Sequence, residues 1–366
     1  MMRLEHTPLS TFLQLMRDVG VPVTPEMLRG QHRELLDDFA DSEITAALAI
    51  AASGEEGGEV VEHDESGESG HDERQLRRPE FEVLRSDLTH PELMIRRAKL
   101  GDYEEWAQEA FARVTLLDKL RETRAFTGFN RVFPENDLGL ANRKALLRHK
   151  ESPERWLPAY LVYGEGLYFE FPEERLQRWE SRDDVRERVE TLAARFATVQ
   201  TERQLRPREI TPRFLLIHTF AHLVMNRLTF ECGYSSAALR ERLYVSGAGE
   251  VPMAAVLIYT AAGDAEGTMG GLVRMGKARY LEPTIRAALR DATWCAADPV
   301  CMEIGRKAGQ GPDACNLAAC HNCALVPETA CEEFNRFLDR GVVIGDVPSG
   351  DSEPGLGFFA DLVATF

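Results

Sequence analysis

The sequence has no cysteine in its first 231 residues, and six of its seven cysteines lie between Cys295 and Cys331. A secreted protein held by disulfides spreads its cysteine pairs through a small chain, so this distribution argues against a disulfide framework. Cysteines clustered in one region of a long chain are typical of metal binding. We therefore expect metal-binding chemistry near the C-terminus.

The sequence also lacks a long hydrophobic run. No stretch approaches the roughly 20 apolar residues that a membrane-spanning helix needs. The first residues mix Arg3, Glu5 and His6 with isolated apolar side chains, which is unlike the apolar core of a secretory signal. We therefore expect a cytoplasmic protein that has no membrane partner.

Basic residues are in deficit, with 43 Lys and Arg against 60 Asp and Glu. The stretch 53–73 alone holds nine acidic residues and no Lys or Arg. A positive field over the whole protein is excluded, so any DNA contact has to use a local patch. Because this acidic stretch has almost nothing to bury, we predict a disordered linker at 53–78. A tail that mimics DNA or binds a basic partner is the alternative.

Helical and strand patterns alternate along the chain, which predicts an α/β fold of the mixed α+β type. Around the acidic linker we predict four regions: a helical N-terminal segment at 1–52, an α+β middle domain at 79–209, a zinc-stabilised domain at 210–345 and a C-terminal tail at 346–366.

Four segments have specific predictions. Apolar residues at helical spacing predict a long helix over 102–122,. Alternation on both sides of Gly164-Glu165-Gly166 predicts a β-hairpin over 156–171,. Thr211-Pro212 begins a strongly apolar helix that reaches about residue 230,, and 253–259 reads as a buried strand.

Four cysteines have the spacing of a zinc site. Cys320-x-x-Cys323 is a short pair and Cys295-x5-Cys301 a looser one, with 18 residues between them. Zinc favours four soft ligands in a tetrahedron, and a short spacing lets one loop supply two of them. A site with four protein ligands leaves no position for water, so it is structural rather than catalytic. Three further side chains are alternative ligands: Cys315, His321 and Cys331.

His218-x3-His222 places two imidazoles one turn apart on the apolar helix,. A zincin protease needs glutamate directly after the first histidine, but Thr219 stands there,. Two readings remain open. The histidines are core groups with satisfied hydrogen bonds, or they form a functional metal cluster with Asp264 and Glu266, as in a metal-dependent nuclease or hydrolase.

The stretch from Gly271 to Ala278 matches a phosphate-binding loop except at its last position, where Ala278 replaces the Ser or Thr that binds magnesium,. Eleven residues also separate it from the preceding predicted strand. We therefore expect no ATPase activity from this chain.

The segment 121–131 interleaves Arg121, Arg124 and Arg131 with Phe126 and Phe129. Such mixing suits phosphate contact combined with base stacking. An ordinary strand edge that presents arginines to a partner is the alternative interpretation.

Several segments between 212 and 340 together resemble the C-terminal domain of the DrmB-type proteins of DISARM phage-defence systems. The resemblance is carried by His218-Thr-Phe-Ala-His222, by Trp294-Cys295 with Asp298-Pro-x-Cys301, and by the stretches 231–244, 256–261, 264–274 and 316–336. The block 121–170 is similar to the segment that precedes this domain in the same proteins.

The resemblance implies several properties. Related domains in DNA helicases carry a four-cysteine zinc site, which implies one structural Zn2+ on Cys295, Cys301, Cys320 and Cys323. DrmB-type proteins work with a separate helicase, so a DrmA-like helicase partner in trans is expected, with DNA as a further partner. Such proteins often begin with a cysteine-rich zinc ribbon, and this sequence has no cysteine before Cys232.

We therefore expect a non-catalytic, zinc-containing subunit of a prokaryotic antiviral helicase complex, which assists DNA binding and helicase activity in trans. Two functions of other classes are the alternatives. One is the metal-dependent nuclease or hydrolase that would use His218, His222, Asp264 and Glu266. The other is a standalone zinc DNA-binding protein.

Overall fold

The computed structural model describes about two thirds of the chain, namely residues 23–25, 27, 28, 41, 69–126, 158–203, 205, 208–235, 237–247, 249–260, 270–307, 309–345 and 355–366. The chain forms two compact units, Met1–Gly67 and Glu68–Phe366. Almost all of the predicted helical segment 1–52 and the first part of the acidic stretch lie outside the described residues. The second unit carries the candidate sites.

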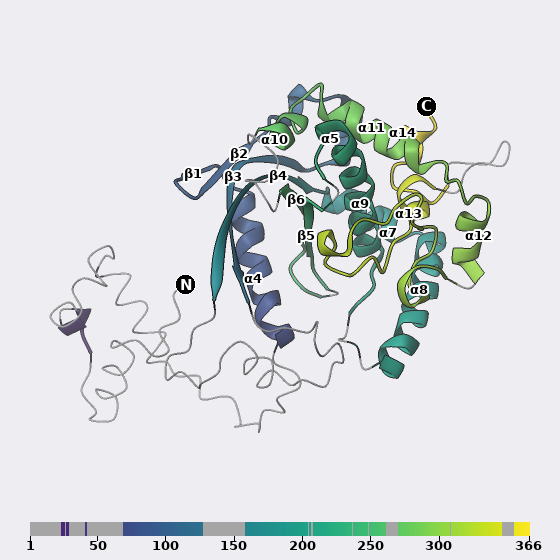
Figure 1. Cartoon of the computed structure of the whole chain (residues 1–366), viewed down its shortest axis with the longest axis horizontal. Coiled ribbons are helices and arrows are strands. Elements are labelled where there is room, and N and C mark those ends of the chain that lie inside the picture. Colours follow the sequence, from purple (N-terminus) through teal and green to yellow (C-terminus); the bar gives the residue numbers. More distant parts are fainter. Residues whose placement is uncertain are drawn as a thin grey trace. The chain divides into compact units, whose positions relative to one another are not determined.

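One antiparallel sheet organises the second unit (Figure 1). Its strand order in the described residues is β1-β2-β3-β4-β6-β5. The strands are β1 Leu88–His90, β2 Leu93–Arg97, β3 Arg113–Ala125, β4 Ala159–Glu170, β5 Leu239–Val245 and β6 Ala254–Thr260. β4 pairs with β6, so the predicted middle and zinc-stabilised domains share this sheet.

Helices cover both faces of the sheet. In β6, Val256 and Ile258 belong to the core on one face, while Leu257 and Tyr259 belong to the core on the other. Because successive side chains of a strand point to opposite faces, a strand buried on both sides lies between two layers. Phe81 contributes to the second of these cores.

Helix α4 (Ser69–Leu84) covers the second face, and its buried Phe81 and Leu84 anchor it there. The prediction of a disordered linker at 53–78 is therefore wrong from Ser69 on. One turn before Phe81, the Arg77 guanidinium hydrogen-bonds to the Leu243 carbonyl at 2.9 Å and to Glu332 at 2.8 Å, which ties the helix to β5 and to the loop after Cys331.

Helix α9 (Pro212–Cys232) covers the first face of the sheet and is buried over most of its length. Thr211 caps its N-terminus by accepting a hydrogen bond from the Phe214 amide, and Gly233 ends it with a positive φ of 71°,. The apolar helix expected from Thr211-Pro212 is confirmed. The strand expected at 253–259 is confirmed as β6.

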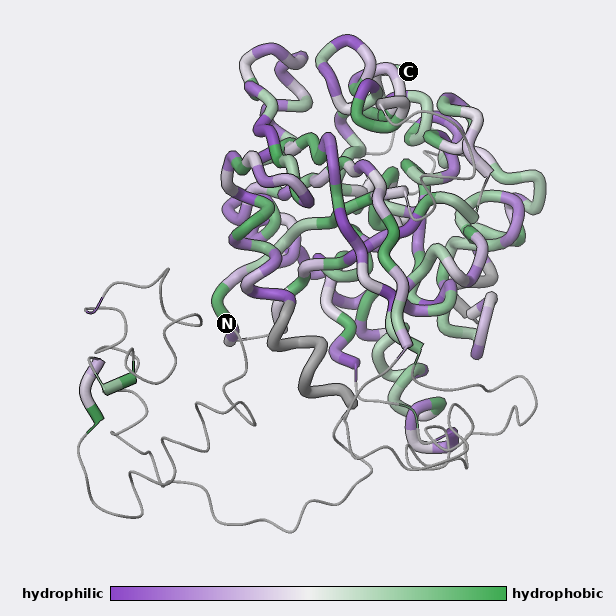
Figure 2. The backbone as a smooth tube through the Cα atoms, turned by 60° about the vertical axis from the view of Figure 1, so that its left-hand side comes forward, coloured by the Kyte–Doolittle hydropathy of each residue, from purple (hydrophilic) through white to green (hydrophobic). Residues whose placement is uncertain are grey.

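The remaining helices surround α9 and the sheet (Figure 1). They are α5 Glu105–Ala110, α7 Glu173–Glu180, α8 Asp183–Arg203, α10 Gly271–Met275, α11 Leu281–Ala292, α12 Val300–Lys307, α13 Arg340–Ile344 and α14 Ala360–Val363. Hydrophobic and hydrophilic segments are interspersed along the tube in Figure 2, as expected where each element buries one face,. The fold is of the mixed α+β class, as predicted.

The predicted long helix over 102–122 is wrong. Helix α5 ends at Ala110, and β3 begins at Arg113. The run from Val114 to Leu117 is continuously buried, with Leu116 in one core and Leu117 in the other. Both faces of a central strand need apolar side chains, and such a run imitates the apolar spacing of a helix.

The predicted β-hairpin over 156–171 is also wrong, because β4 runs unbroken from Ala159 to Glu170. Its glycines permit a close approach of β6 rather than a turn. A Cβ atom at Gly164 would lie 2.2 Å from the Thr260 carbonyl oxygen. Glycine within a strand often marks such a contact.

No helix within the described part of the chain combines the length and the apolar character needed to cross a membrane.

Candidate metal centre

Four cysteines converge beyond the C-terminal end of α11. Cys295 follows this helix, Cys301 lies in α12, and Cys320 and Cys323 lie in one turn of the loop that follows. We call these four residues the four-cysteine cluster. Their sulfur atoms all lie within 4.8 Å of one another.

The sulfur spacing fits a tetrahedral metal. The Sγ atoms of Cys295 and Cys320 are 3.5 Å apart, and Cys323 Sγ lies 3.8 Å from both Cys301 Sγ and Cys320 Sγ. Zinc–sulfur bonds of about 2.3 Å in a tetrahedron place the sulfur atoms about 3.8 Å apart. A disulfide would require about 2.05 Å. The cluster therefore fits one structural zinc ion.

Buried polar groups hold the cluster in place. The Asp298 carboxylate accepts a hydrogen bond from the Cys295 amide at 2.8 Å and pairs with the Arg340 guanidinium. Arg340 is fully buried and also donates to the Ala292 carbonyl at 2.8 Å. The Gln310 amide donates to the carbonyl and the sulfur of Cys301, at 2.9 and 3.5 Å. These contacts tie α11, α12 and α13 to one site.

The thiols of this cluster differ in acidity. The hydrogen bond from Cys323 lowers the pKa of Cys301 to about 5, and the Gln310 amide acts in the same direction. Burial raises the pKa of Cys295 to about 11. Because only a thiolate binds metal, the lowered pKa of Cys301 is consistent with a metal-binding thiol,.

The other two cysteines considered as ligands lie elsewhere. Cys315 is fully buried, and its sulfur contacts the carbonyl oxygen of Asp313 at 3.4 Å. Cys331 lies beside the two histidines of α9. His321 occupies the turn between Cys320 and Cys323 and is exposed.

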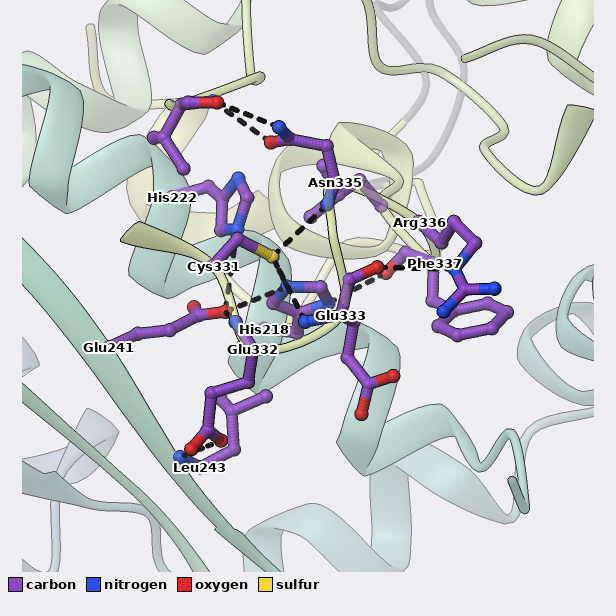
Figure 3. A network of polar contacts seen from close by, with 12 residues as sticks. His218, His222, Glu241, Leu243, Cys331, Glu332, Glu333, Asn335, Arg336 and Phe337 are labelled. Carbon is purple, nitrogen blue, oxygen red and sulfur yellow. Dashed lines mark hydrogen bonds and ion pairs between the residues drawn. The ribbon is translucent and has the colours of Figure 1, made fainter. Parts of the chain in front are cut away.

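The second convergence of potential ligands lies between α9, β5 and the loop that contains Cys331 (Figure 3). We call it the histidine cluster, and its members are His218, His222, Glu241 and Cys331. Their ligand atoms lie within 4.8 Å of one another, and all four residues are buried. Asp264 and Glu266, the predicted companions of the histidines, lie outside the described residues.

Distances within the histidine cluster are short. His218 Nε2 lies 3.2 Å from Cys331 Sγ and 3.1 Å from Glu241 Oε1. His222 Nε2 lies 3.6 Å from the same carboxylate oxygen. Burial raises the pKa of Glu241, but His218 and His222 outweigh it, so the pKa of this carboxyl lies well below its usual range. Glu241 is therefore a buried carboxylate anion.

Glu241 was missed by the sequence reasoning, although β5 carries a signal for it. Leu239, Glu241 and Leu243 share the strand face that is buried against α9. Alternation thus places an acidic side chain at an inward position, where a charge needs a partner. Its histidine partners are about twenty residues away in sequence, so spacing alone did not connect them.

The backbone amides of the stretch that resembles a phosphate-binding loop bind a carboxylate of the protein. The buried Glu165 carboxylate accepts hydrogen bonds from the amides of Gly270, Leu272 and Val273 at 2.8–3.3 Å, and from the Tyr234 hydroxyl at 2.8 Å. Amides of this kind would hold phosphate in a nucleotide-binding loop. Here they are satisfied by a side chain of β4.

Two of the three predicted contact arginines lie in β3, and Arg131 lies outside the described residues. Arg121 is ion-paired with Glu92, and Arg124 pairs with Glu122 at 2.8 Å. Beside Arg124, the exposed rings of Phe126 and Tyr160 stack with centroids 5.6 Å apart. The structure thus places arginine and stacked aromatic side chains on one surface.

Comparison with protein families finds a match to the MrfA Zn-binding domain over residues 220–324. This range contains the whole four-cysteine cluster, so a zinc-binding domain coincides with a site whose geometry fits zinc. His218 and Cys331 of the histidine cluster lie outside the matched range.

Among curated proteins, the chain is similar to the DISARM protein DrmB of Bacillus paralicheniformis, with 34% identity over 264 residues. The similar region covers 69% of this chain and 46% of that protein. The chain therefore spans about half the length of this relative.

Proposed function

The chain belongs to the DrmB-type family of zinc-binding proteins, and from this premise we propose that it is a non-catalytic subunit of a DISARM-like antiviral helicase complex. In this role it binds a helicase partner and DNA in the cytoplasm and alters the helicase in trans. The similarity to a DISARM protein over 69% of the chain is the observation that carries the proposal.

Two features support ATP hydrolysis by a partner helicase and not by this chain. The Glu165 carboxylate accepts the hydrogen bonds of the backbone amides that would otherwise bind a nucleotide phosphate. The four-cysteine cluster has four protein ligands and no open position, so it stabilises the fold and performs no chemistry. We propose Cys295, Cys301, Cys320 and Cys323 as the ligands of its zinc.

The surface at Arg124, Phe126 and Tyr160 is the proposed DNA contact. Base–aromatic stacking contributes about 1–3 kcal/mol per base and tolerates any sequence. The Arg124 guanidinium lies 5.7 Å from the centroid of the Tyr160 ring, so cation and aromatic faces are combined. The acidic partners Glu92 and Glu122 reduce the local positive charge, which makes stacking the main source of affinity.

The hydrolase alternative is not favoured by the geometry. His218 and His222 are fully buried, and their ring nitrogens face other protein groups. A hydrolytic metal needs an open coordination position and a path for substrate. The standalone DNA-binding protein differs from our proposal only in needing no partner.

The proposal is tested by purifying the chain together with a DrmA-like helicase. We expect a stable complex in which this chain changes the DNA-stimulated ATPase rate of the helicase, and no ATPase activity from the chain alone. Lys277→Ala should change neither result. ATP turnover by the chain alone that Lys277→Ala abolishes, or no complex at all, would contradict the proposal.

The DNA contact is tested separately, by fluorescence anisotropy with single-stranded and double-stranded DNA. Joint replacement of Phe126 and Tyr160 by Ala should weaken binding at least tenfold, while Leu161→Ala, which truncates an exposed neighbour of Tyr160, is the control. Joint replacement of Arg121 and Arg131 by Ala should give a shallower salt dependence if these residues touch phosphates. DNA cleavage that needs a divalent metal would favour the hydrolase, and tight binding without a helicase would favour the standalone protein.

A further inference from the structure

We propose that the histidine cluster is a second metal site, which holds a divalent zinc ion in a closed, structural position. It is distinct from the four-cysteine cluster, because the two share no ligand. It also lies partly outside the zinc-binding family match, which omits His218 and Cys331.

The first argument concerns the protons on the two imidazoles. His218 Nδ1 lies 3.2 Å from the Phe337 carbonyl oxygen, and His222 Nδ1 lies 2.9 Å from the Ala324 carbonyl oxygen. A carbonyl oxygen only accepts hydrogen bonds, so each Nδ1 carries the proton. In the neutral rings both Nε2 atoms are therefore lone-pair acceptors, which is the tautomer that metal-binding histidines adopt.

The second argument concerns what these acceptors face. Both Nε2 atoms point at the Glu241 carboxylate, which is itself only an acceptor,. His222 Nε2 and Glu241 Oε2 are fully buried and have no hydrogen-bond partner among the described residues. A proton on the Cys331 thiol would serve His218 Nε2 and still leave His222 Nε2 and Glu241 Oε2 without a donor. A buried group of acceptors is stable only around a cation.

The third argument is the ligand set and its spacing. Two imidazoles, one carboxylate and one thiolate are all zinc ligands, with bonds of about 2.0–2.3 Å that place ligand atoms about 3.3–3.8 Å apart in a tetrahedron. The distances from His218 Nε2 to Cys331 Sγ and to Glu241 Oε1 are 3.2 and 3.1 Å, and that from His222 Nε2 to Glu241 Oε1 is 3.6 Å. The cluster is close to the required size.

The surrounding backbone also suits metal ligands. Cys331 Sγ accepts hydrogen bonds from the amides of Glu333 at 3.4 Å and Asn335 at 3.2 Å, which favour a thiolate. The Glu332 amide donates to Glu241 Oε1 at 3.1 Å and fixes the carboxylate. With the two carbonyls that hold the imidazoles, every ligand is oriented by an outer partner,. Figure 3 shows the four ligands with Glu332, Glu333, Asn335 and Phe337 around them.

The charge balance favours this site in a fully buried place. A divalent cation with one carboxylate, one thiolate and two neutral imidazoles has no net charge. An isolated Glu241 carboxylate in the same place would be strongly unfavourable. The competing arrangement is a proton in place of the metal, which makes one imidazole an imidazolium paired with Glu241.

The test uses the full chain, purified without chelator, and needs no variant. We expect about two zinc ions per chain by elemental analysis. Over both clusters the ligands comprise five sulfur atoms and three nitrogen or oxygen atoms. X-ray absorption at the zinc edge should therefore show about 2.5 sulfur and about 1.5 lighter neighbours per zinc, at about 2.3 and 2.0 Å.

A charge-neutralising variant assigns the second ion. Glu241→Gln should lower the content to about one zinc with a shell of sulfur alone. Cys232→Ser is the matched control, because Cys232 belongs to neither cluster, and it should keep both ions and the mixed shell. Retention of two ions by Glu241→Gln would overturn the proposal.

The wild-type measurement decides the matter even if the variant does not fold. About one zinc per folded chain with only sulfur neighbours would overturn the proposal, and the cluster would then be the imidazolium–carboxylate network. This result would leave the proposed partnership with a helicase untouched, because that proposal does not depend on a second metal.

Discussion

The Nδ1–H of His222 donates to the carbonyl oxygen of Ala324, the residue that directly follows the proposed zinc ligand Cys323. This bond joins the buried helix α9 to the loop that carries half of the four-cysteine cluster. The loop has little regular secondary structure, so its position depends on the metal and on such contacts. Substitution of these cysteines should therefore also disturb the packing of α9.

Cys320→Ser should remove the zinc of the four-cysteine cluster and make the loop around it sensitive to protease. Structural zinc sites contribute about 10–16 kcal/mol of apparent folding free energy in small peptides, so the loss of stability should be large. Metal analysis and limited proteolysis measure both effects, with Cys232→Ser as the control. Full zinc retention with an unchanged proteolysis pattern would refute the assignment of Cys320 as a ligand.

Gly164→Ala should destabilise the sheet by about 1–3 kcal/mol, the usual cost of overpacking a core. The new Cβ atom would lie 2.2 Å from the Thr260 carbonyl oxygen, so β4 and β6 would have to separate. Gly101→Ala is the control, because a Cβ atom there meets nothing within 4 Å. Chemical denaturation measures both variants, and equal midpoints would show that β6 does not approach β4 as closely as described.

Glu165→Ala should cost about 2 kcal/mol or more, because it removes the acceptor for three backbone amides and the Tyr234 hydroxyl,. Glu165→Gln keeps one oxygen acceptor and should have an intermediate effect. Neither variant should bind ATP, since Ala278 supplies no hydroxyl for magnesium. Unchanged unfolding of Glu165→Ala would show that these amides do not depend on the carboxylate.

The stability of the fold should fall as the pH rises above about 10. Burial raises the pKa values of Tyr168 and Tyr244 well above the ordinary value for a phenol. In the unfolded chain both phenols ionise near pH 10, so the unfolded state binds fewer protons than the folded state and gains stability. The stability that these two neutral phenols contribute is fully present below the pKa that they have in the unfolded chain. It is lost as the pH rises towards the higher pKa that they have in the folded chain.

The loss should be about 1.4 kcal/mol per pH unit for each such tyrosine. Chemical denaturation at several alkaline pH values measures this loss of stability. Tyr168→Phe should reduce the slope, because Tyr168 is fully buried and burial raises the pKa of its phenol. Equal slopes for the wild type and Tyr168→Phe would contradict this prediction.

Sequence reasoning succeeded where the signal is local. The ends of α9 are specified by Thr211 and Gly233, which act within one turn of the backbone. The spacing of Cys320 and Cys323 reflects the reach of one loop around a metal. Both features depend on neighbours in the chain, so they are visible without knowledge of the fold.

Sequence reasoning failed where tertiary contacts determine the secondary structure or the partner of a side chain. The run at Val114–Leu117 is buried on both faces of a central strand, and such a run has the same apolar content as a helix,. Gly164 looks like a turn residue until β6 is packed beside it. Glu241 meets His218 only because β5 pairs with β6 beneath α9, and no local pattern encodes that pairing.

The pairing of β4 with β6 limits how this chain can be divided. The zinc-binding family match begins at residue 220, inside α9, and does not include β4. A recombinant fragment designed on that match would expose the backbone amides and carbonyls of β6 between Ala255 and Tyr259. Uncovered strand edges of this kind recruit other chains and promote aggregation. The segment that the family match covers is thus smaller than the segment that shares this sheet, and expression boundaries for this protein belong before α4.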